Sequence, residues 1–362
     1  MLRIPFDPTE VEEAVEYPGF LGVMVKRYKT PISPKENYAL VFGHKMPLWI
    51  PVSGDTLSLT PRIDPDNIAR GSCSEANPLA PEELIGGRDK FGVEWVYIPM
   101  VKGSMVRPGN PILRDVNDWN TVINFPDVEA WDWEKSKASN AEYVKTDRFL
   151  SITILTGFFE RLISFMDFEN AAISMIDEDQ KDAIHKLFSA LADLYIKMVE
   201  KYIYCYGIDQ LCLHDDWGSQ RAPFFSLSTA REMIVPYIKR VSDFCHSRGV
   251  YFSIHSCGKN ELLVPAYIEA GCDSWNGQDV NDKELLYEMY GDKIILGIRP
   301  DILTVPNKLI DAEETIKTAR RFVDKYCENY DKKPVFVESF GISSEFCDSI
   351  YTESRKVFYE IH

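Results

Sequence analysis

The alternation of short apolar runs with amphipathic helices is the feature that most constrains the fold of this chain. From about Phe149 onward, each run is followed by a polar loop and then by a segment with helical periodicity, as in parallel βα units. Gly249, Gly271 and Gly291 stand where a glycine would end the helix before a run. The runs are SITILTG (151–157), DQLCLHDD (209–216), VYFSIHSCG (250–258), DSWNG (273–277), KIILGIRP (293–300) and PVFVESFG (334–341).

Two further runs raise the number of predicted strands to eight. They are HKMPLWIPVSG (44–54) and the weaker VEWVYIPMV (93–101), and residues 53–147, rich in Pro, Asp, Trp and Asn, predict an insertion or hairpin between regular units. We therefore predict an α/β fold: a (β/α)8 TIM barrel over residues 41–362, preceded by an N-terminal helical arm over residues 1–40. A doubly wound sheet is the alternative, although no GxGxxG or GxxxxGK[ST] motif follows any predicted strand.

The net charge of the chain argues against nucleic-acid and membrane partners, and its cysteine spacing argues against disulfide bonds. The chain has 56 Asp and Glu against 40 Lys and Arg, and its formal net charge of −16 repels phosphate backbones and anionic lipids. We expect no nucleic-acid partner and no membrane partner. The first 20 residues lack a basic region followed by an apolar one, which predicts a cytoplasmic protein. The eight cysteines form no CxxC pair, so we expect reduced, mostly buried thiols.

Polar side chains collect where five successive predicted strands end. In parallel α/β folds the chemistry lies at these carboxyl ends, although a single polar residue there is commonly a helix cap. The predicted catalytic residues are His214, Asp215, Asp216 and Glu338, and the predicted substrate-binding residues are Trp217, Gln220, Asn276, Gln278, Arg299 and Asp301. Because adjacent strand residues face opposite ways, only one of Asp215 and Asp216 can point into the site, and the other is expected to cap a helix or to pair with a basic residue.

His255 and Cys257 are candidate metal ligands. They lie two residues apart on a predicted strand, so their side chains leave the same face. Zinc binds neutral imidazole and thiolate. An HxC pair is a short motif, and a core histidine beside a buried thiol is the alternative interpretation.

Four segments resemble the uroporphyrinogen decarboxylase superfamily. They are HDDWGSQ (214–220), IHSCG (254–258), AGCD (270–273) and GIRPDIL (297–303). The resemblance covers roughly residues 36–350 and implies a (β/α)8 barrel. DKFGVEW (89–95) is similar to a landmark of the branch that contains cobalamin-dependent methyltransferases, which move methyl groups between corrinoid proteins and thiols or methylated substrates.

The chain departs from the decarboxylases of that superfamily at two places. Their arginine-rich substrate loop would follow PLWIPV, where this chain has SGDTLSLTPR (53–62). Their histidine after the last strand is replaced within Ser339-Phe340-Gly341-Ile342. The resemblance therefore does not imply decarboxylation of a porphyrinogen.

The resemblance to the zinc methyltransferases is better but incomplete. Their HxC motif lies where His255 and Cys257 lie, and their third ligand is a cysteine at the place of Phe340. We expect a weak or empty zinc site, with Glu338 as the substitute third ligand if metal is bound and Cys347 as the alternative.

The resemblance implies a methyltransferase-like enzyme that moves a methyl group between a small methylated compound or a thiol and a corrinoid protein. The chain lacks a DxHxxG corrinoid-binding motif, so the corrinoid is expected on the partner protein, and zinc is the expected metal. His214, Asp215 or Glu338 would protonate the leaving atom. The alternatives are a decarboxylase that uses Arg299 and His255, and a non-catalytic corrinoid- or tetrapyrrole-binding protein. A homodimer is a candidate assembly.

Overall fold

The computed structural model describes residues 3–18, 24–100, 103–300, 312–338 and 342–361. The chain forms two compact units. Unit 1 comprises residues 1–57, 146–150 and 273–362, and unit 2 comprises residues 58–145 and 151–272. The predicted division into an arm (1–40) and a barrel (41–362) follows other boundaries and stays a prediction.

The N-terminal residues of unit 1 mix helices with strands. Their elements are α1 (Thr9–Glu12), β1 (Val15–Pro18), β2 (Met24–Arg27) and α2 (Pro34–Phe42), with β1 and β2 antiparallel. The segment predicted to be helical is therefore partly extended, because Val15 and Tyr17 alternate with Glu16 at the period of a strand. Ser33 begins α2 with a capping box, in which its hydroxyl accepts the Glu36 N–H and the Glu36 carboxylate accepts the Ser33 N–H.

The rest of unit 1 alternates strands with helices. Its elements are β10 (Ser274–Gly277), α12 (Lys283–Tyr290), β11 (Ile295–Ile298), α13 (Ala312–Cys327), β12 (Val335–Val337) and α14 (Ser344–Ile361). β10, β11 and β12 run parallel, and Leu296 pairs with Trp275 on one side and Val335 on the other. The rings of Tyr38 and Phe149 stack at 4.3 Å between centroids.

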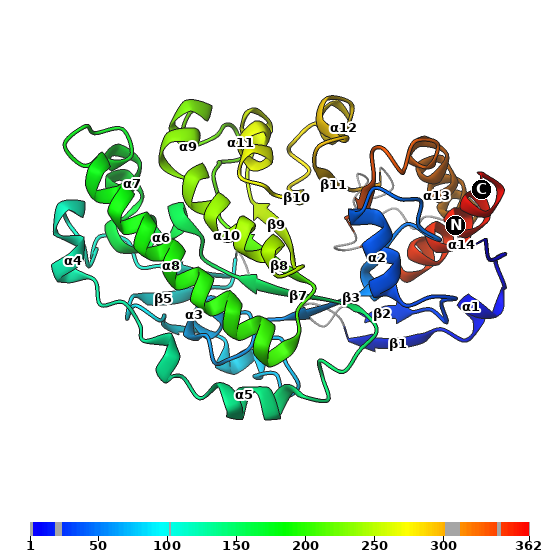
Figure 1. The fold of residues 1–362 in the computed structure, drawn as a ribbon, viewed down its shortest axis with the longest axis horizontal. Helices are drawn as coiled ribbons and strands as arrows, with labels where there is room; N and C mark the ends of the chain where they lie inside the picture. Colours follow the sequence, from blue (N-terminus) through cyan, green and yellow to red (C-terminus); the bar gives the residue numbers. More distant parts are fainter. Residues whose placement is uncertain (1–2, 19–23, 101–102, 301–311, 339–341, 362) are drawn as a thin grey trace. The chain divides into compact units, whose positions relative to one another are not determined.

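Unit 2 repeats the alternation of parallel strands and helices. Its elements are β7 (Phe149–Ile154, beginning in unit 1), α6 (Phe158–Met166), α7 (Phe168–Ser174), α8 (Lys181–Tyr206), β8 (Gln210–His214), α9 (Leu227–Met233), α10 (Val235–Ser247), β9 (Tyr251–Ser256) and α11 (Val264–Glu269). β7, β8 and β9 are parallel. α8 packs along α10, and α10 packs on β9 (Figure 1). Apolar residues of α8 such as Leu187, Leu191 and Met198 are fully buried, which explains its amphipathic sequence.

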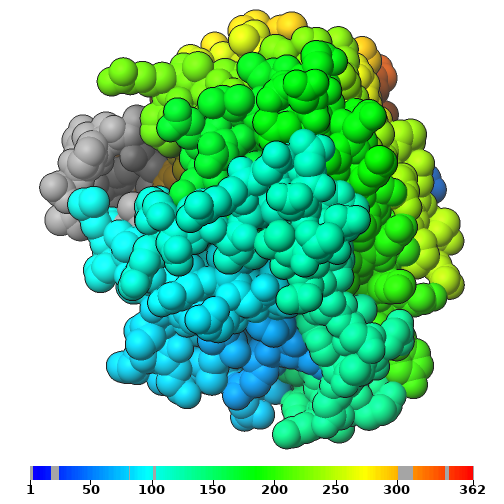
Figure 2. Space-filling view, turned by 90° about the vertical axis from the view of Figure 1, so that its left-hand side faces the viewer, coloured from blue at the N-terminus to red at the C-terminus, as the bar shows by residue number. Residues whose placement is uncertain are grey.

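The region predicted as an insertion carries a separate antiparallel sheet. This sheet consists of β4 (Gly86–Arg88), β5 (Glu94–Ile98) and β6 (Gly103–Val106). The same stretch of chain also contains β3 (Thr56–Leu59), α3 (Pro65–Ala69), α4 (Trp119–Val122) and α5 (Trp133–Asn140). α4 and α5 contact α8, and the cyan surface of this region lies against the green helices in Figure 2. The run VEWVYIPMV is thus a strand, but of this small sheet and not of the parallel one.

The run HKMPLWIPVSG forms no strand, so that prediction is wrong. Its backbone groups are bonded by side chains instead: Asn37 accepts the Leu48 N–H and donates to the Trp49 carbonyl, and Ser354 accepts the Ile50 N–H. Pro47 and Pro51 within the run have no N–H to offer a neighbouring strand.

The α/β class of the prediction is confirmed. Over the described residues, β10, β11 and β12 are parallel neighbours in unit 1, and β7, β8 and β9 are parallel neighbours in unit 2. The closed eight-stranded barrel stays a prediction. The described helices include none that is both long enough and apolar enough to cross a membrane.

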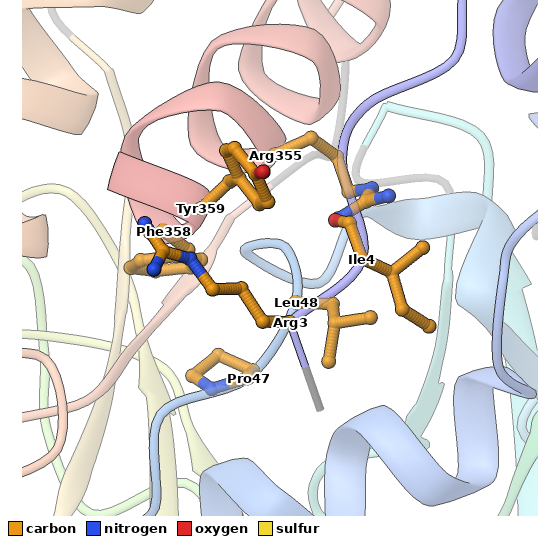
Figure 3. Close-up of a pocket in the computed structure, with 7 residues that line it drawn as sticks. All are labelled: Arg3, Ile4, Pro47, Leu48, Arg355, Phe358 and Tyr359. Atoms are coloured by element: carbon orange, nitrogen blue, oxygen red, sulfur yellow. The ribbon is translucent and has the colours of Figure 1, made fainter. Parts of the chain in front are cut away.

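The N-terminal segment of unit 1 is held to α14 by a buried arginine. Arg355 donates to Glu10 at 2.9 Å and to the carbonyl oxygens of Ile4 and Pro5. Figure 3 shows a small hollow beside this contact, where Arg3 lies over the ring of Tyr359. The hollow contains no predicted site residue, and Arg355 is already bonded, so we assign it a structural role.

Candidate functional site

Two histidines and a cysteine converge at the carboxyl ends of β8 and β9 in unit 2. The register of the two strands places His214 opposite His255, and their rings stack at 4.8 Å between centroids. The Nε2 atom of His255 lies 3.3 Å from the Sγ atom of Cys257. The predicted convergence of His255 and Cys257 on one face is therefore seen.

Asp216 completes the cluster. Its Oδ1 atom accepts the Cys257 N–H at 2.6 Å and lies 3.9 Å from the Nε2 atom of His214. One ligand-type atom from each of the four residues, His214, Asp216, His255 and Cys257, lies within 4.8 Å of every other. All four side chains are partly exposed, so the cluster is reachable from solvent. These four residues could hold a metal ion, and we call them the four-donor cluster.

Two glycines allow the loops that carry this cluster to approach each other. Gly258 follows Cys257 with a φ of +89°, and a Cβ atom on it would lie 2.1 Å from the carbonyl oxygen of Gly218. Lys259 donates its N–H to the Ser219 carbonyl at 2.7 Å. Only glycine combines this φ with this contact, so the position of Cys257 depends on Gly258.

Gly258→Ala is expected to displace the Cys257 loop, because the added methyl group would overlap the Gly218 backbone. Metal affinity of the variant should fall at least tenfold in a chelator competition assay. Gly249→Ala is the matched control, since Gly249 also has a positive φ but nothing within 4 Å of its Cβ position. An equal loss of affinity in both variants would contradict this role of Gly258.

Behind the cluster, His214 is bonded to a buried carboxylate that in turn binds an arginine. The Nδ1 atom of His214 lies 2.7 Å from Oε2 of Glu160, whose Oε1 accepts from Arg70 at 2.9 Å. Burial disfavours the charge of Glu160, but Arg70 and His214 outweigh it and lower the pKa of Glu160 to about 2. Burial also opposes protonation of His214, yet the charge of Glu160 raises the pKa of His214.

Glu160 and Arg70 are not among the residues predicted from the sequence. Glu160 lies three residues beyond SITILTG, whose end carries no charged residue, so a search slightly past the strand end would have found it. Arg70 comes from the insertion, directly after α3, and no local pattern connects it with β8.

Asp215 lies outside the four-donor cluster, and its predicted catalytic role stays a prediction. Its fully buried carboxylate accepts the N–H groups of Phe158, Phe159 and Glu160 at the start of α6. The Asp pair therefore divides as the strand alternation predicts, with one member in the site and one as a helix cap.

The two predicted residues that follow the Asp pair do not line the cluster. Trp217 is fully buried, and its Nε1 atom donates to Asp215 at 2.9 Å. Its predicted role in substrate binding stays a prediction. Gln220 lies exposed in the loop that Ser219 and Ala222 close by a hydrogen bond. Its predicted role stays a prediction.

The remaining predicted residues lie in unit 1. Asn276 lies in β10, one residue before its end, and Glu338 follows β12. A Cβ atom on Gly297 would come within 2.7 Å of Oδ1 of Asn276 and 3.3 Å of Oε2 of Glu338. The side chains of Asn276 and Glu338 thus both lie next to Gly297 of β11. Buried Lys283, which was not predicted from the sequence, donates to the Gly297 carbonyl at 2.6 Å.

Several other predictions concern unit 1. Arg299 is paired with Asp279 at 3.1 Å, and Gln278 accepts the N–H of Asn281 through its backbone carbonyl. Asp301 and Phe340 lie outside the described residues. Cys347 is buried on α14.

Among the described residues, His214 and Asp216 are the further metal-ligand side chains that lie beside His255 and Cys257. Glu338, the predicted third ligand, belongs to unit 1, whereas the four-donor cluster belongs entirely to unit 2. Its assignment as a metal ligand stays a prediction.

Comparison with known proteins identifies one family and one fold. The family model described as uroporphyrinogen decarboxylase (URO-D) matches residues 144–342. A methyltransferase from Methanosarcina mazei superposes with a TM-score of 0.55 at 13% identity, covering 91% of this chain and 99% of that chain. A sugar phosphate isomerase/epimerase from Parabacteroides distasonis ATCC 8503 reaches a TM-score of 0.29 at 9% identity, over 66% of this chain and 80% of that one, too low to support an argument. No curated protein matches the chain.

Proposed function

The chain belongs to the uroporphyrinogen decarboxylase (URO-D) family, and from this premise we propose that it is a zinc-dependent, methyltransferase-like enzyme. Members of this family are enzymes, and the structural likeness to a methyltransferase extends over 91% of the chain. The proposed reaction moves a methyl group between a small methylated compound or a thiol and a corrinoid protein. The observation that carries the proposal is the four-donor cluster.

The donor set fits zinc. Two imidazole nitrogens, a thiolate and a carboxylate are the ligand types that zinc takes, usually four at a time. Donor atoms around one zinc ion lie roughly 3.5 Å apart, and those of the cluster already lie within 4.8 Å of one another. Small rotamer changes would therefore suffice to bring them to one ion.

The charges of the site also fit a divalent cation. The thiolate of Cys257 and the carboxylate of Asp216 would together offset a charge of two, while His214 and His255 bind as neutral ligands. The nearby Glu160 carboxylate is compensated separately by Arg70, 2.9 Å away. The surroundings therefore leave little uncompensated charge once a cation is bound.

The residues of the cluster would hold the ion beside the heteroatom that loses or gains the methyl group. When bound, a zinc ion supplies Lewis acidity to that heteroatom. When the methyl group leaves, the heteroatom keeps the pair of bonding electrons, so a site that stabilises negative charge there favours the transfer. His214 and His255 hold parallel rings, and Asp216 is anchored by the Cys257 N–H, so the donors are preorganised.

The corrinoid is proposed to arrive on a separate protein. The chain contains no DxHxxG motif, which corrinoid-carrying domains use. Corrinoid in its cobalt(I) state is a strong nucleophile, so with a methylated compound the enzyme's task is to activate the leaving heteroatom. In the opposite direction the thiol is the nucleophile and cobalt(I) leaves, so the task is to remove the thiol proton. The methyl donor and acceptor are to be identified by assay.

The decarboxylase alternative has less support. It would use Arg299 as a free cation, but Arg299 is paired with Asp279. The non-catalytic alternative gives no reason for four metal-ligand side chains at adjoining strand ends. The four-donor cluster therefore favours the methyltransferase.

Metal analysis combined with a methyl-transfer assay tests the proposal. We expect stoichiometric zinc in the tag-free protein, and methyl transfer from at least one member of a panel of O-, N- and S-methylated compounds to free cob(I)alamin. Removing zinc with a chelator should abolish the transfer and adding zinc should restore it. Transfer that persists in the metal-free protein, or carbon dioxide release from a panel of small carboxylic acids, would contradict the proposal.

A further inference from the structure

We propose that Glu160, held by Arg70, is the positioning residue that fixes the tautomer and ring orientation of His214. The inference rests on the proposed function, because it explains how one histidine of the four-donor cluster is prepared to bind a metal. Glu160 and Arg70 lie behind His214, on the side of the ring that faces away from Asp216, since Nδ1 contacts Glu160 and Nε2 faces Asp216.

The contact between Glu160 and His214 determines which ring nitrogen carries the proton. Oε1 of Glu160 accepts from Arg70 at 2.9 Å, so the carboxyl group is paired as a carboxylate and can only accept hydrogen bonds. Oε2 lies 2.7 Å from Nδ1 of His214, which must therefore donate. A neutral His214 then keeps its lone pair on Nε2, the atom that belongs to the cluster side.

Glu160 is held firmly enough to have this role. The side chains of Arg70, Glu160 and His214 are only 13%, 12% and 18% exposed, so solvent competes weakly for their hydrogen bonds. Glu160 lies in the first turn of α6, whose N-terminal N–H groups are capped by Asp215. The helix start thus fixes the backbone from which the carboxylate extends.

A residue of the insertion, Trp95, helps to fix the position of the Arg70 side chain. Its guanidinium lies over the ring of Trp95 on β5, 4.7 Å from the ring centroid. Trp95 donates through Nε1 to Asp89 at 2.9 Å, and Asp89 in turn binds Arg161, the residue after Glu160. The small antiparallel sheet of the insertion is therefore connected to the four-donor cluster through a closed chain of contacts, which gives the insertion a function in the site.

Two measurements on the full-length protein test this inference. Imidazole nitrogen–proton correlation spectra of the metal-free protein, at a pH where His214 is neutral, report its tautomer directly. Competition with a chromophoric chelator reports zinc affinity, and urea unfolding reports whether a variant is folded. The variants are Glu160→Gln, Arg70→Met and Arg70→Lys. The matched control is Glu269→Gln, which makes the same change in an exposed ion pair with Arg231 of the same unit.

We expect the wild-type His214 to carry its proton on Nδ1. Glu160→Gln and Arg70→Met should each lower zinc affinity about 10–100-fold, the usual effect of losing a group that orients a metal-binding histidine. Arg70→Lys keeps the positive charge and should recover part of the affinity. Glu269→Gln should bind zinc like the wild type.

The outcomes separate this inference from the proposed function. A wild-type His214 with its proton on Nε2 would overturn the inference, as would unchanged zinc affinity in folded Glu160→Gln and Arg70→Met. A wild-type protein that binds no zinc would instead overturn the proposed zinc centre. In that case, loss of the Nδ1–H tautomer in Glu160→Gln but not in Glu269→Gln would still support positioning by Glu160, and its retention would refute it.

Discussion

Replacing Arg161 by methionine is expected to lower the free energy of unfolding by about 3–5 kcal/mol. Arg161 is fully buried in unit 2 and binds the carboxylates of Asp66 and Asp89, which are buried as well. Methionine can fill much of the volume but cannot compensate the two charges. Lys90 lies 3.0 Å from both Asp64 and Asp66, so it would be the remaining cation for three buried carboxylates.

Urea unfolding of the variant checks this expectation, with Arg240→Met as the matched control. Arg240 forms an ion pair with Asp193 at 2.5 Å in the same unit, but the side chains are 40% and 60% exposed. An exposed pair contributes between zero and about 1 kcal/mol, so the control should lose little. If the two variants lose equal stability, the buried network does not hold α6 to the insertion as we infer.

Cys257→Ser is expected to reduce zinc affinity and methyl transfer by on the order of 100-fold or more, because it removes the thiolate from the four-donor cluster. Serine is close to cysteine in size, and Cys257 is only partly buried, so stability should change by less than about 1 kcal/mol. Zinc content after chelator dialysis, cob(I)alamin methylation and urea unfolding measure the three effects.

Cys212→Ser serves as the control for the thiol. Cys212 lies on β8 below His214, and its side chain contacts the hydroxyl groups of Ser253 and Thr153, so a serine there finds polar neighbours. It should retain zinc and activity. Full activity in Cys257→Ser would remove the thiol from the mechanism, and loss of activity in both variants would point to a structural effect of substitution in these strands.

Local patterns in the sequence were sufficient for the α/β class and for part of the site. Strand periodicity places His255 and Cys257 on one face, and the same alternation separates Asp216 from Asp215, because both follow from a two-residue repeat within a single strand. The motifs around these residues also identified the family, since they depend on residue order alone. None of these inferences required knowledge of a contact distant in sequence.

Whether an apolar run became a strand, and in which sheet, depended on the partners available for its backbone hydrogen bonds. HKMPLWIPVSG has the apolar character of a strand, yet Asn37 and Ser354, 11 and 304 residues away from their partners, satisfy its backbone instead. VEWVYIPMV is a strand, but its partners in β4 and β6 are antiparallel neighbours. The composition of a run shows how apolar it is, but the strand with which it pairs depends on segments elsewhere in the chain.

The partners of the metal-ligand pair were likewise decided by tertiary structure. The register of β8 against β9 sets His214 opposite His255, and the close approach of Gly218 and Gly258 brings Asp216 to the Cys257 N–H. Glu160 and Arg70 join them from α6 and from the insertion. The sequence by itself determined the fold class, the family and which side chains share a strand face, because these follow from short-range periodicity and motif order. Only the folded chain decided which of those side chains meet, because strand register and loop packing depend on residues tens to hundreds of positions apart.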